Sequence, residues 1–135
     1  MVTFIEAKVR SEQLQSDGSK KHTIDRYLVQ ADSFTEAEAV IINSVDTDSI
    51  VSVSRSNVKE IIMNDSEGTF YKARVELVSI DERTMKEKRK AYTIMVEADD
   101  ILEALHRVHE GLEGTASDYE IIAVTKTPIV GICGI

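Results

Sequence analysis

Two pairs of cationic residues occupy equivalent places in the two halves of the sequence and are the strongest candidates for binding a ligand. Lys8 corresponds to Arg74, and Arg55 corresponds to Lys126. A residue with a hydroxyl group precedes each member of the second pair. Cations beside O–H donors bind phosphate through charge-assisted hydrogen bonds, so one hypothesis is a site for an anionic nucleotide. The alternative is a set of ordinary solvated charges. The candidate ligand-binding residues are Lys8, Arg74, Arg55, Lys126, Ser54 and Thr125.

The sequence patterns of catalysis and of metal binding are weak. His106, His109 and Glu110 lie about one turn apart on an expected helix, but their spacing does not match the helical motifs of zinc proteases. The other acidic residues are spread over turns and helix starts, which nominates no pair for acid–base catalysis. Cys133, the only cysteine, lies in an apolar tail that gives its thiol no reason to ionise. We therefore nominate no catalytic residue, no metal ligand and no cofactor.

Composition argues against several broad classes of function. Hydrophobic residues make up 42% of the 135 positions and charged residues 30%, which is typical of a folded soluble domain. The net charge of −8 argues against a protein that coats DNA or RNA, because such proteins present a basic face. No apolar run reaches the length of about 18 residues that spans a bilayer, and residues 1–10 lack the features of a signal peptide. We expect a cytoplasmic protein that binds neither membranes nor nucleic acids in general.

Two similar segments mark places where a strand is followed by a helix. Residues 30–37 read QADSFTEA, and residues 97–104 read EADDILEA. In each segment an apolar run ends at Ala, a capping residue follows (Ser33 or Asp100), and Glu occurs three positions after the cap. This is a capping box, in which the cap accepts a hydrogen bond from a free N–H group of the first helical turn. Helices are therefore expected to begin after each cap.

The rest of the chain repeats around these two points. The strand expected at residues 69–76 matches that at residues 3–10 with an offset of 66, the returning strands match with an offset of 67, and the third strands match with an offset of 71. Offsets that change only within turns are what duplication followed by loop insertion produces. Chance similarity between two α+β halves is the alternative. We predict a first strand–strand–helix–strand repeat over residues 1–63, a linker over 64–68 and a second repeat over 69–135, together forming one compact domain.

We predict an α+β fold in which each repeat forms a sheet of strand order 2-1-3. A hairpin makes the first strand antiparallel to the second, and a helical crossover makes the third strand parallel to the second. The regular alternation of the first strand suits a central position. Both helices are expected on one sheet face, packed on Ile5, Ala7, Val9, Tyr27 and Val29 and on their counterparts Tyr71, Ala73, Val75, Ile94 and Val96.

The opposite sheet face carries more apolar residues than a face exposed to water usually does. We expect this face to pack against the other repeat or against a second subunit, and we favour a homo-oligomer. Scattered apolar residues on the surface of a monomer are the alternative. The candidate interface residues are Phe4, Phe70, Leu28, Met95 and Ile24.

Several phrases of the sequence resemble a known family. They are residues 33–39 (SFTEAEA), 98–100 (ADD), 110–115 (EGLEGT), 117–121 (SDYEI) and 127–129 (TPI). Over nearly the whole chain this combination resembles domain of unknown function 4494, a family of Bacteroidota and of their phages and mobile elements. The resemblance implies no activity, cofactor or catalytic residue. Its phage setting suggests a small protein that binds a host factor or captures an immune nucleotide messenger.

These observations favour a non-enzymatic binding or interaction module of phage or mobile-element type, expected to be homo-oligomeric. The alternative is a small-ligand binder that sequesters an anionic nucleotide. An uncharacterised enzyme is the third possibility. The partners expected are a second copy of the chain, a host protein or an anionic small molecule.

Overall fold

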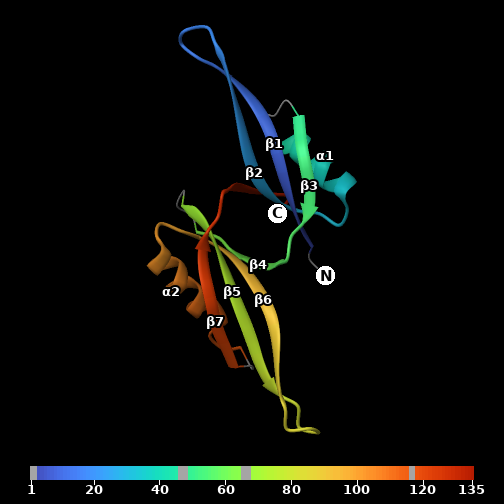
Figure 1. Ribbon diagram of the computed structural model, residues 1–135, viewed down its shortest axis with the longest axis vertical. Coiled ribbons are helices and arrows are strands. Elements are labelled where there is room, and N and C mark those ends of the chain that lie inside the picture. Colours follow the sequence, from blue (N-terminus) through green and yellow to red (C-terminus); the bar gives the residue numbers. More distant parts are fainter. Residues whose placement is uncertain (1–2, 46–48, 65–67, 116–117) are drawn as a thin grey trace. The chain divides into compact units, whose positions relative to one another are not determined.

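The computed structural model describes residues 3–45, 49–64, 68–115 and 118–135, which form eight strands and two helices (Figure 1). In chain order the elements are β1 (Phe4–Leu14), β2 (Lys20–Gln30), α1 (Phe34–Ser44), β3 (Ser49–Arg55), β4 (Val58–Ile62), β5 (Thr69–Ile80), β6 (Glu87–Ala98), α2 (Ile101–Leu112), β7 (Asp118–Lys126) and β8 (Ile129–Cys133). The predicted α+β class is confirmed. Most of the predicted linker, residues 65–67, lies outside the described residues.

The chain divides into two units, and each unit takes its fourth strand from the other half of the sequence. The first unit comprises Met1–Asn57 and Pro128–Ile135, and the second comprises Val58–Thr127. The strand order is β3-β1-β2-β8 in the first unit and β4-β6-β5-β7 in the second. β4 therefore lies at the end of the predicted first repeat but pairs with β6, whereas β8 lies at the end of the predicted second repeat but pairs with β2. Both of these pairings are parallel.

The predicted order 2-1-3 describes three strands of each sheet but omits the fourth. β1 lies between β2 and β3, and β5 lies between β6 and β7, as expected. The strands absent from the predicted order, β4 and β8, are five residues long, and each pairs with a strand far away in the sequence. Because no local pattern encodes such pairing, the units also differ from the predicted repeats 1–63 and 69–135.

Both helices begin at the predicted capping boxes. Ser33 Oγ accepts a hydrogen bond from the Glu36 backbone N–H at 3.1 Å, and Asp100 Oδ1 accepts one from the Glu103 N–H at 2.8 Å. In both boxes the glutamate side chain accepts a hydrogen bond from the backbone N–H of the residue before the cap, at 3.0 and 3.3 Å. These bonds satisfy donors that the first helical turn leaves free, which explains why the strand-to-helix transition occurs here.

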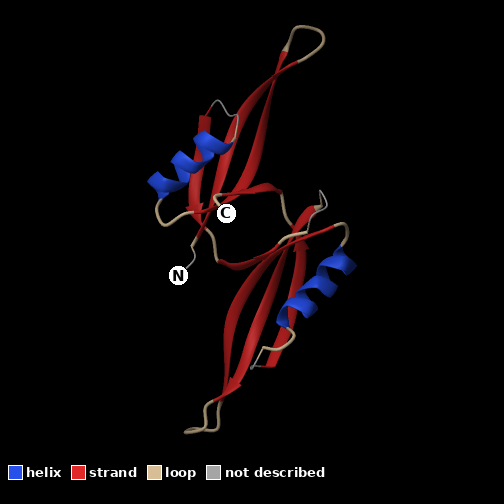
Figure 2. Ribbon diagram, turned by 180° about the vertical axis from the view of Figure 1, so that it is seen from behind, coloured by secondary structure: helices blue, strands red, loops and turns tan. Residues whose placement is uncertain are grey.

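Each helix packs on one face of the sheet of its own unit, as Figure 2 shows. The buried core of the first unit consists of Ile5, Ala7, Val9, Val29, Ala31, Ala37 and Ile41. That of the second consists of Tyr71, Ala73, Val75, Ile94, Val96, Ala98, Ala104, Val108 and Leu112. The residues predicted to lie beneath the helices belong to these clusters, with Tyr27 packed at the margin of the first.

The edge strands β3 and β7 each carry a β-bulge, and these two bulges are equivalent in sequence. The pairing of β3 with β1 shifts at Val51, and the pairing of β7 with β5 shifts at Ile122, 71 positions later. A bulge adds one unpaired residue and bends the strand locally. The shared bulge is a structural sign of the same duplication that the sequence offsets indicate.

Candidate functional site

The structure places Lys8 and Arg74 at equivalent positions on the central strands of the two sheets, β1 and β5. Neighbouring residues along a strand face opposite sides, so both cations lie on the sheet face away from the helix. Lys8 is half-buried and Arg74 is exposed. Ser54 and Thr125 lie on this face too, because they pair with residues two positions before Lys8 and Arg74.

The second pair of cations lies on the other sheet face. Arg55 and Lys126 end β3 and β7, and they pair with the core residues Ile5 and Tyr71 beneath the helices. The Arg55 guanidinium carbon lies 5.3 Å from the centre of the Phe34 ring, in the geometry of a cation–π contact. Each unit therefore presents its two cations on opposite faces. A nucleotide site formed by all four would need residues of both units and stays a prediction.

The candidate interface residues differ in accessibility. Phe4, Phe70, Leu28 and Met95 are buried, whereas Ile24 is 51% exposed. Of this group only Ile24 is accessible to another molecule. Contact with a second copy through this face stays a prediction.

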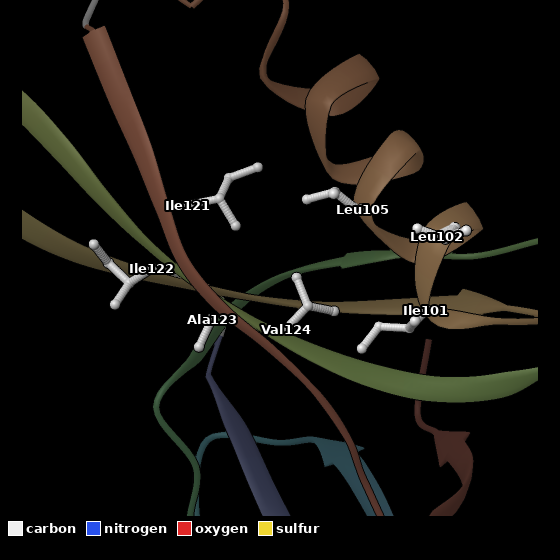
Figure 3. Close-up of a pocket in the computed structure, with 7 residues that line it drawn as sticks. All are labelled: Ile101, Leu102, Leu105, Ile121, Ile122, Ala123 and Val124. Carbon is white, nitrogen blue, oxygen red and sulfur yellow. The ribbon is translucent and has the colours of Figure 1, made fainter.

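An apolar groove lies within the second unit between α2 and β7 (Figure 3). The groove is open to solvent and has a volume of about 350 Å³. Leu102 on its rim is 75% exposed, and Ile101 is 50% exposed. Exposed apolar side chains that gather around a groove, rather than lying singly, indicate a binding site. The groove is lined by Ile101, Leu102 and Leu105 of α2 and by Ile121, Ile122, Ala123 and Val124 of β7.

Side chains from both faces of β7 line the groove. In Figure 3, Ile121 and Val124 extend toward the helix, whereas Ile122 and Ala123 lie on the other side of the strand. Ile122 is the bulge residue of β7. The groove thus includes the space beside the outer edge of the strand as well as the space beneath the helix.

The first repeat carries different residues at the equivalent positions. Thr35 and Glu38 stand where the second repeat has Leu102 and Leu105, and Ser52 stands where it has Ala123. Phe34, the counterpart of Ile101, lies beneath the Arg55 guanidinium. The strand residues Ile50, Val51 and Val53 correspond to Ile121, Ile122 and Val124 and are apolar as well. The two repeats therefore differ mainly along the helix, which carries polar residues in the first repeat and leucines in the second.

Comparison with known proteins identifies the family. The family model described as "Domain of unknown function (DUF4494)" matches residues 3–135. The chain belongs to the DUF4494 family. No curated protein and no solved structure matches the chain.

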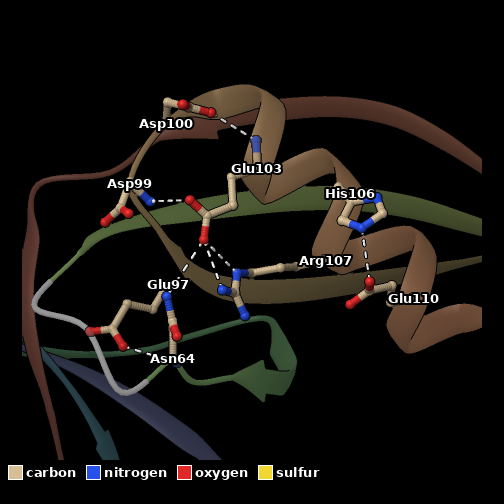
Figure 4. A network of polar contacts seen from close by, with 8 residues as sticks. All are labelled: Asn64, Glu97, Asp99, Asp100, Glu103, His106, Arg107 and Glu110. Carbon is tan, nitrogen blue, oxygen red and sulfur yellow. Dashed lines mark hydrogen bonds and ion pairs between the residues drawn. The ribbon is translucent and has the colours of Figure 1, made fainter.

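A polar network fixes the start of α2 in this DUF4494 member (Figure 4). Arg107 donates to Glu103 Oε1 through Nε at 2.9 Å and forms an ion pair with it through Nη2 at 2.8 Å. Asn64, two residues after β4, donates from Nδ2 to the same oxygen at 3.5 Å. The Asn64 backbone N–H donates to Oε1 of the buried Glu97 at 3.0 Å. The network joins the end of β4 to β6 and α2, and so positions the helical wall of the groove.

Ionisable groups with shifted pKa values lie outside the residues that line the groove. Hydrogen bonds from Arg89 to Glu120 and Glu76 raise the pKa of the guanidinium above its ordinary value. Burial raises the pKa of Tyr92, whose hydroxyl also donates to a carboxylate, and burial raises the pKa of the Cys133 thiol. These pKa shifts follow from local burial and hydrogen bonding. The residues that line the groove are all apolar, so the groove offers a ligand apolar contacts.

The described residues contain no group of three His, Cys, Asp or Glu side chains that could hold a metal ion. His106, whose spacing on the helix does not support a zinc site, contacts Glu110, with Nε2 and Oε1 2.8 Å apart. No helix in the described part of the chain is long and apolar enough to cross a membrane.

Sequence reasoning missed the groove, although one signal pointed to it. Ala104, Val108 and Leu112 form an apolar stripe on α2 that packs into the core. Leu102 lies outside this stripe, so its side chain has no place in the core of its own unit. An apolar residue on the polar side of an amphipathic helix was the available sign of a binding surface.

Proposed function

We propose that this protein is a non-enzymatic binding module and that it binds a partner protein through the groove between α2 and β7. The observation that carries the proposal is the contrast between the repeats. The first repeat carries Thr35 and Glu38 on the same scaffold, so folding does not require the exposed Leu102 and the half-buried Leu105. An exposed leucine such as Leu102 also favours aggregation, which gives a reason to replace it where it serves no purpose.

The size and lining of the groove agree with a peptide segment as its ligand. A volume of about 350 Å³ admits a few side chains rather than a whole domain. The lining residues are aliphatic and provide no charged group that would orient a nucleotide or a catalytic substrate. Aliphatic side chains of a partner would therefore be held by burial, at roughly 25 cal/mol for each Å² of apolar surface removed from water.

A displayed library of random twelve-residue peptides tests this proposal. Peptides selected on the wild-type protein should bind the double variant Leu102→Thr, Leu105→Glu at least about tenfold more weakly, since each large side chain contributes more than 1 kcal/mol when buried. The variant carries the residues of the first repeat, so its fold has an internal precedent. The control is Thr35→Ala, Glu38→Ala at the equivalent positions of α1, which should leave binding unchanged. Selected peptides that bind both double variants equally would refute the proposal.

We further propose that the module self-associates and that it belongs to a phage or mobile element. In that setting the module would bind a host protein. The exposed Ile24 is the accessible member of the candidate interface. Light scattering after size-exclusion chromatography tests self-association, and Ile24→Asp should lower the measured mass if this face joins two copies.

Nucleotide binding is the second candidate, favoured by the equivalent placement of Lys8 and Arg74 on the two sheets. A thermal-shift screen with nucleotides and cyclic dinucleotides tests it. A ligand present at 100 times its Kd should stabilise the protein by about 2.7 kcal/mol. No shift across the screen would count against this candidate.

A further inference from the structure

We propose that the partner segment binds in an extended conformation, as an additional strand along the free edge of β7, and that it carries basic residues beside its apolar ones. This inference rests on the proposed function, because it specifies the ligand of the same groove. It concerns the second unit alone. The pairing of β7, the direction of the lining side chains and the distribution of charge support it.

The outer edge of β7 is available for pairing. Among the described strands β7 pairs with β5 and with no other, and it ends the sheet order β4-β6-β5-β7. An edge strand presents backbone N–H and C=O groups that can accept a further strand. Addition of a peptide strand to such an edge is an established mode of recognition, in which backbone hydrogen bonds supply affinity and side-chain pockets supply specificity.

The lining of the groove favours a strand over a helix as the ligand. Ile121 and Val124 lie on the helix side of β7, and Ile122 and Ala123 lie on the other side (Figure 3). A helix lying between α2 and β7 would contact the first pair. A strand beside the edge would place alternate side chains on both faces and contact both pairs, because successive residues of a strand point in opposite directions.

The equivalent edge of the first unit keeps the apolar strand residues Ile50, Val51 and Val53 but lacks the apolar helical wall, because Thr35 and Glu38 stand in place of Leu102 and Leu105. The Arg55 guanidinium stacks over Phe34 there, and Ser52 replaces the groove residue Ala123. Polar and charged side chains on an edge are a common protection against unwanted pairing. The second unit shares the bulge at Ile122 but has Ile101 in place of Phe34, which offers no aromatic ring to its cation.

The charge around the groove indicates a basic partner. From Asp99, just before α2, to the end of β7 the chain carries seven acidic residues and two basic ones. Two of the acidic residues form ion pairs, Glu103 with Arg107 and Glu120 with Arg89 of β6. The acidic residues are Asp99, Asp100, Glu103, Glu110, Glu113, Asp118 and Glu120, and the basic ones are Arg107 and Lys126. Complementary charge raises the association rate and selects among partners. A segment that alternates Leu or Ile with Lys or Arg has the chemistry that this edge would recognise.

The test uses the full-length protein and the peptides selected on it, each synthesised with a single N-methyl group at successive backbone positions. N-methylation removes one N–H donor and leaves the side chains in place. A paired strand donates every second N–H to its neighbour, so we expect binding to weaken about tenfold or more at alternate positions and to change little between them. Selected peptides should also be enriched in Lys and Arg and should bind more weakly at 0.5 M salt than at 0.1 M.

The outcomes separate this inference from the proposed function. In one outcome, peptides need Leu102 and Leu105 for binding but lose affinity at every third or fourth position of the N-methyl series, the period of a helix. This result would refute the extended conformation of the partner but not the proposed binding function. Acidic or neutral peptides whose affinity does not change with salt would overturn the basic partner. Failure to select any peptide that distinguishes the wild type from Leu102→Thr, Leu105→Glu would overturn both proposals.

Discussion

Met85 adopts a backbone conformation that residues with a side chain rarely adopt. Its φ is +58°, and its side chain, in the turn between β5 and β6, is 76% exposed. Gly18 supplies a positive φ, +88°, in the corresponding turn between β1 and β2. A residue other than Gly in this region costs roughly 1 kcal/mol, so the second hairpin carries a strain that the first avoids.

Replacement of Met85 by Gly should therefore stabilise the protein by about 0.5–1 kcal/mol. Urea unfolding followed by circular dichroism measures the change. Gly18→Ala is the matched control and should destabilise the protein by a similar amount, because Ala disfavours that φ. A loss of stability in Met85→Gly would show that the methionine side chain contributes more than its exposure indicates.

Tyr92 links stability to alkaline pH. Its hydroxyl donates to Glu60 Oε2 at 2.9 Å, and burial together with this carboxylate raises the pKa of Tyr92 above 10.0. A group with a raised folded pKa contributes stability in full below its unfolded pKa and loses it as pH rises through the folded value. Stability should accordingly decline above about pH 10.

The variant Tyr92→Phe should lose about 1 kcal/mol at pH 7, because Glu60 loses a hydrogen-bond donor, and should show a shallower decline above pH 10. Urea midpoints measured from pH 7 to pH 11 provide the test. Glu60→Gln keeps an acceptor for the hydroxyl and serves as the control. Parallel pH profiles for the wild type and Tyr92→Phe would contradict this account.

At the scale of elements, the two capping boxes share their geometry but differ in support. Glu36 contacts the backbone of its own box. Glu103 does the same and also binds Arg107 and Asn64. The start of α2 is therefore tied to β4 as well as to its own first turn, which stiffens the helix that forms one wall of the groove.

Glu103→Ala should consequently destabilise the protein more than Glu36→Ala does. We expect about 0.5 kcal/mol for Glu36, as part of an exposed capping box, and about 1–2 kcal/mol for Glu103, whose loss leaves the Arg107 guanidinium without its partner. Urea unfolding of the two variants gives the comparison. Equal losses would show that the contacts with Arg107 and Asn64 contribute nothing to stability.

At the scale of the whole molecule, the exchange of β4 and β8 makes the two halves of the chain depend on each other. The sheet of the first unit contains a strand from the C-terminal half, and the sheet of the second contains a strand from the N-terminal half. Parallel pairing of β4 with β6 and of β8 with β2 can occur only when both halves are present. Neither half contains all the strands of its own unit.

A protease site inserted between Asn64 and Gly68 tests this dependence. After cleavage the two fragments should co-elute in size-exclusion chromatography, and they should separate only in denaturant, since each contributes a strand to the other's sheet. The control is the same cleaved protein lacking residues 128–135, which should bind less tightly because β8 is gone. Fragments that elute separately under native conditions would show that the exchanged strands do not hold the halves together.

Sequence alone determined the features that depend on neighbours along the chain. The capping residues Ser33 and Asp100, the helices that follow them and the central place of β1 and β5 were all predicted, because capping and alternation are local patterns. The residues beneath the helices were predicted for the same reason, since the period of a strand determines which side chains share a face.

Only the tertiary structure revealed the fourth strand of each sheet and the groove. β4 and β8 are short, and their partners are chosen by long-range pairing, for which the sequence carries no periodic signal. The groove requires Leu102, on the exposed side of α2, to lie near Ile122, a bulge residue on an edge strand. The proximity of these two side chains depends on how the helix crosses the sheet and where the strand bulges. Both are determined by packing in three dimensions, and no spacing along the chain encodes them.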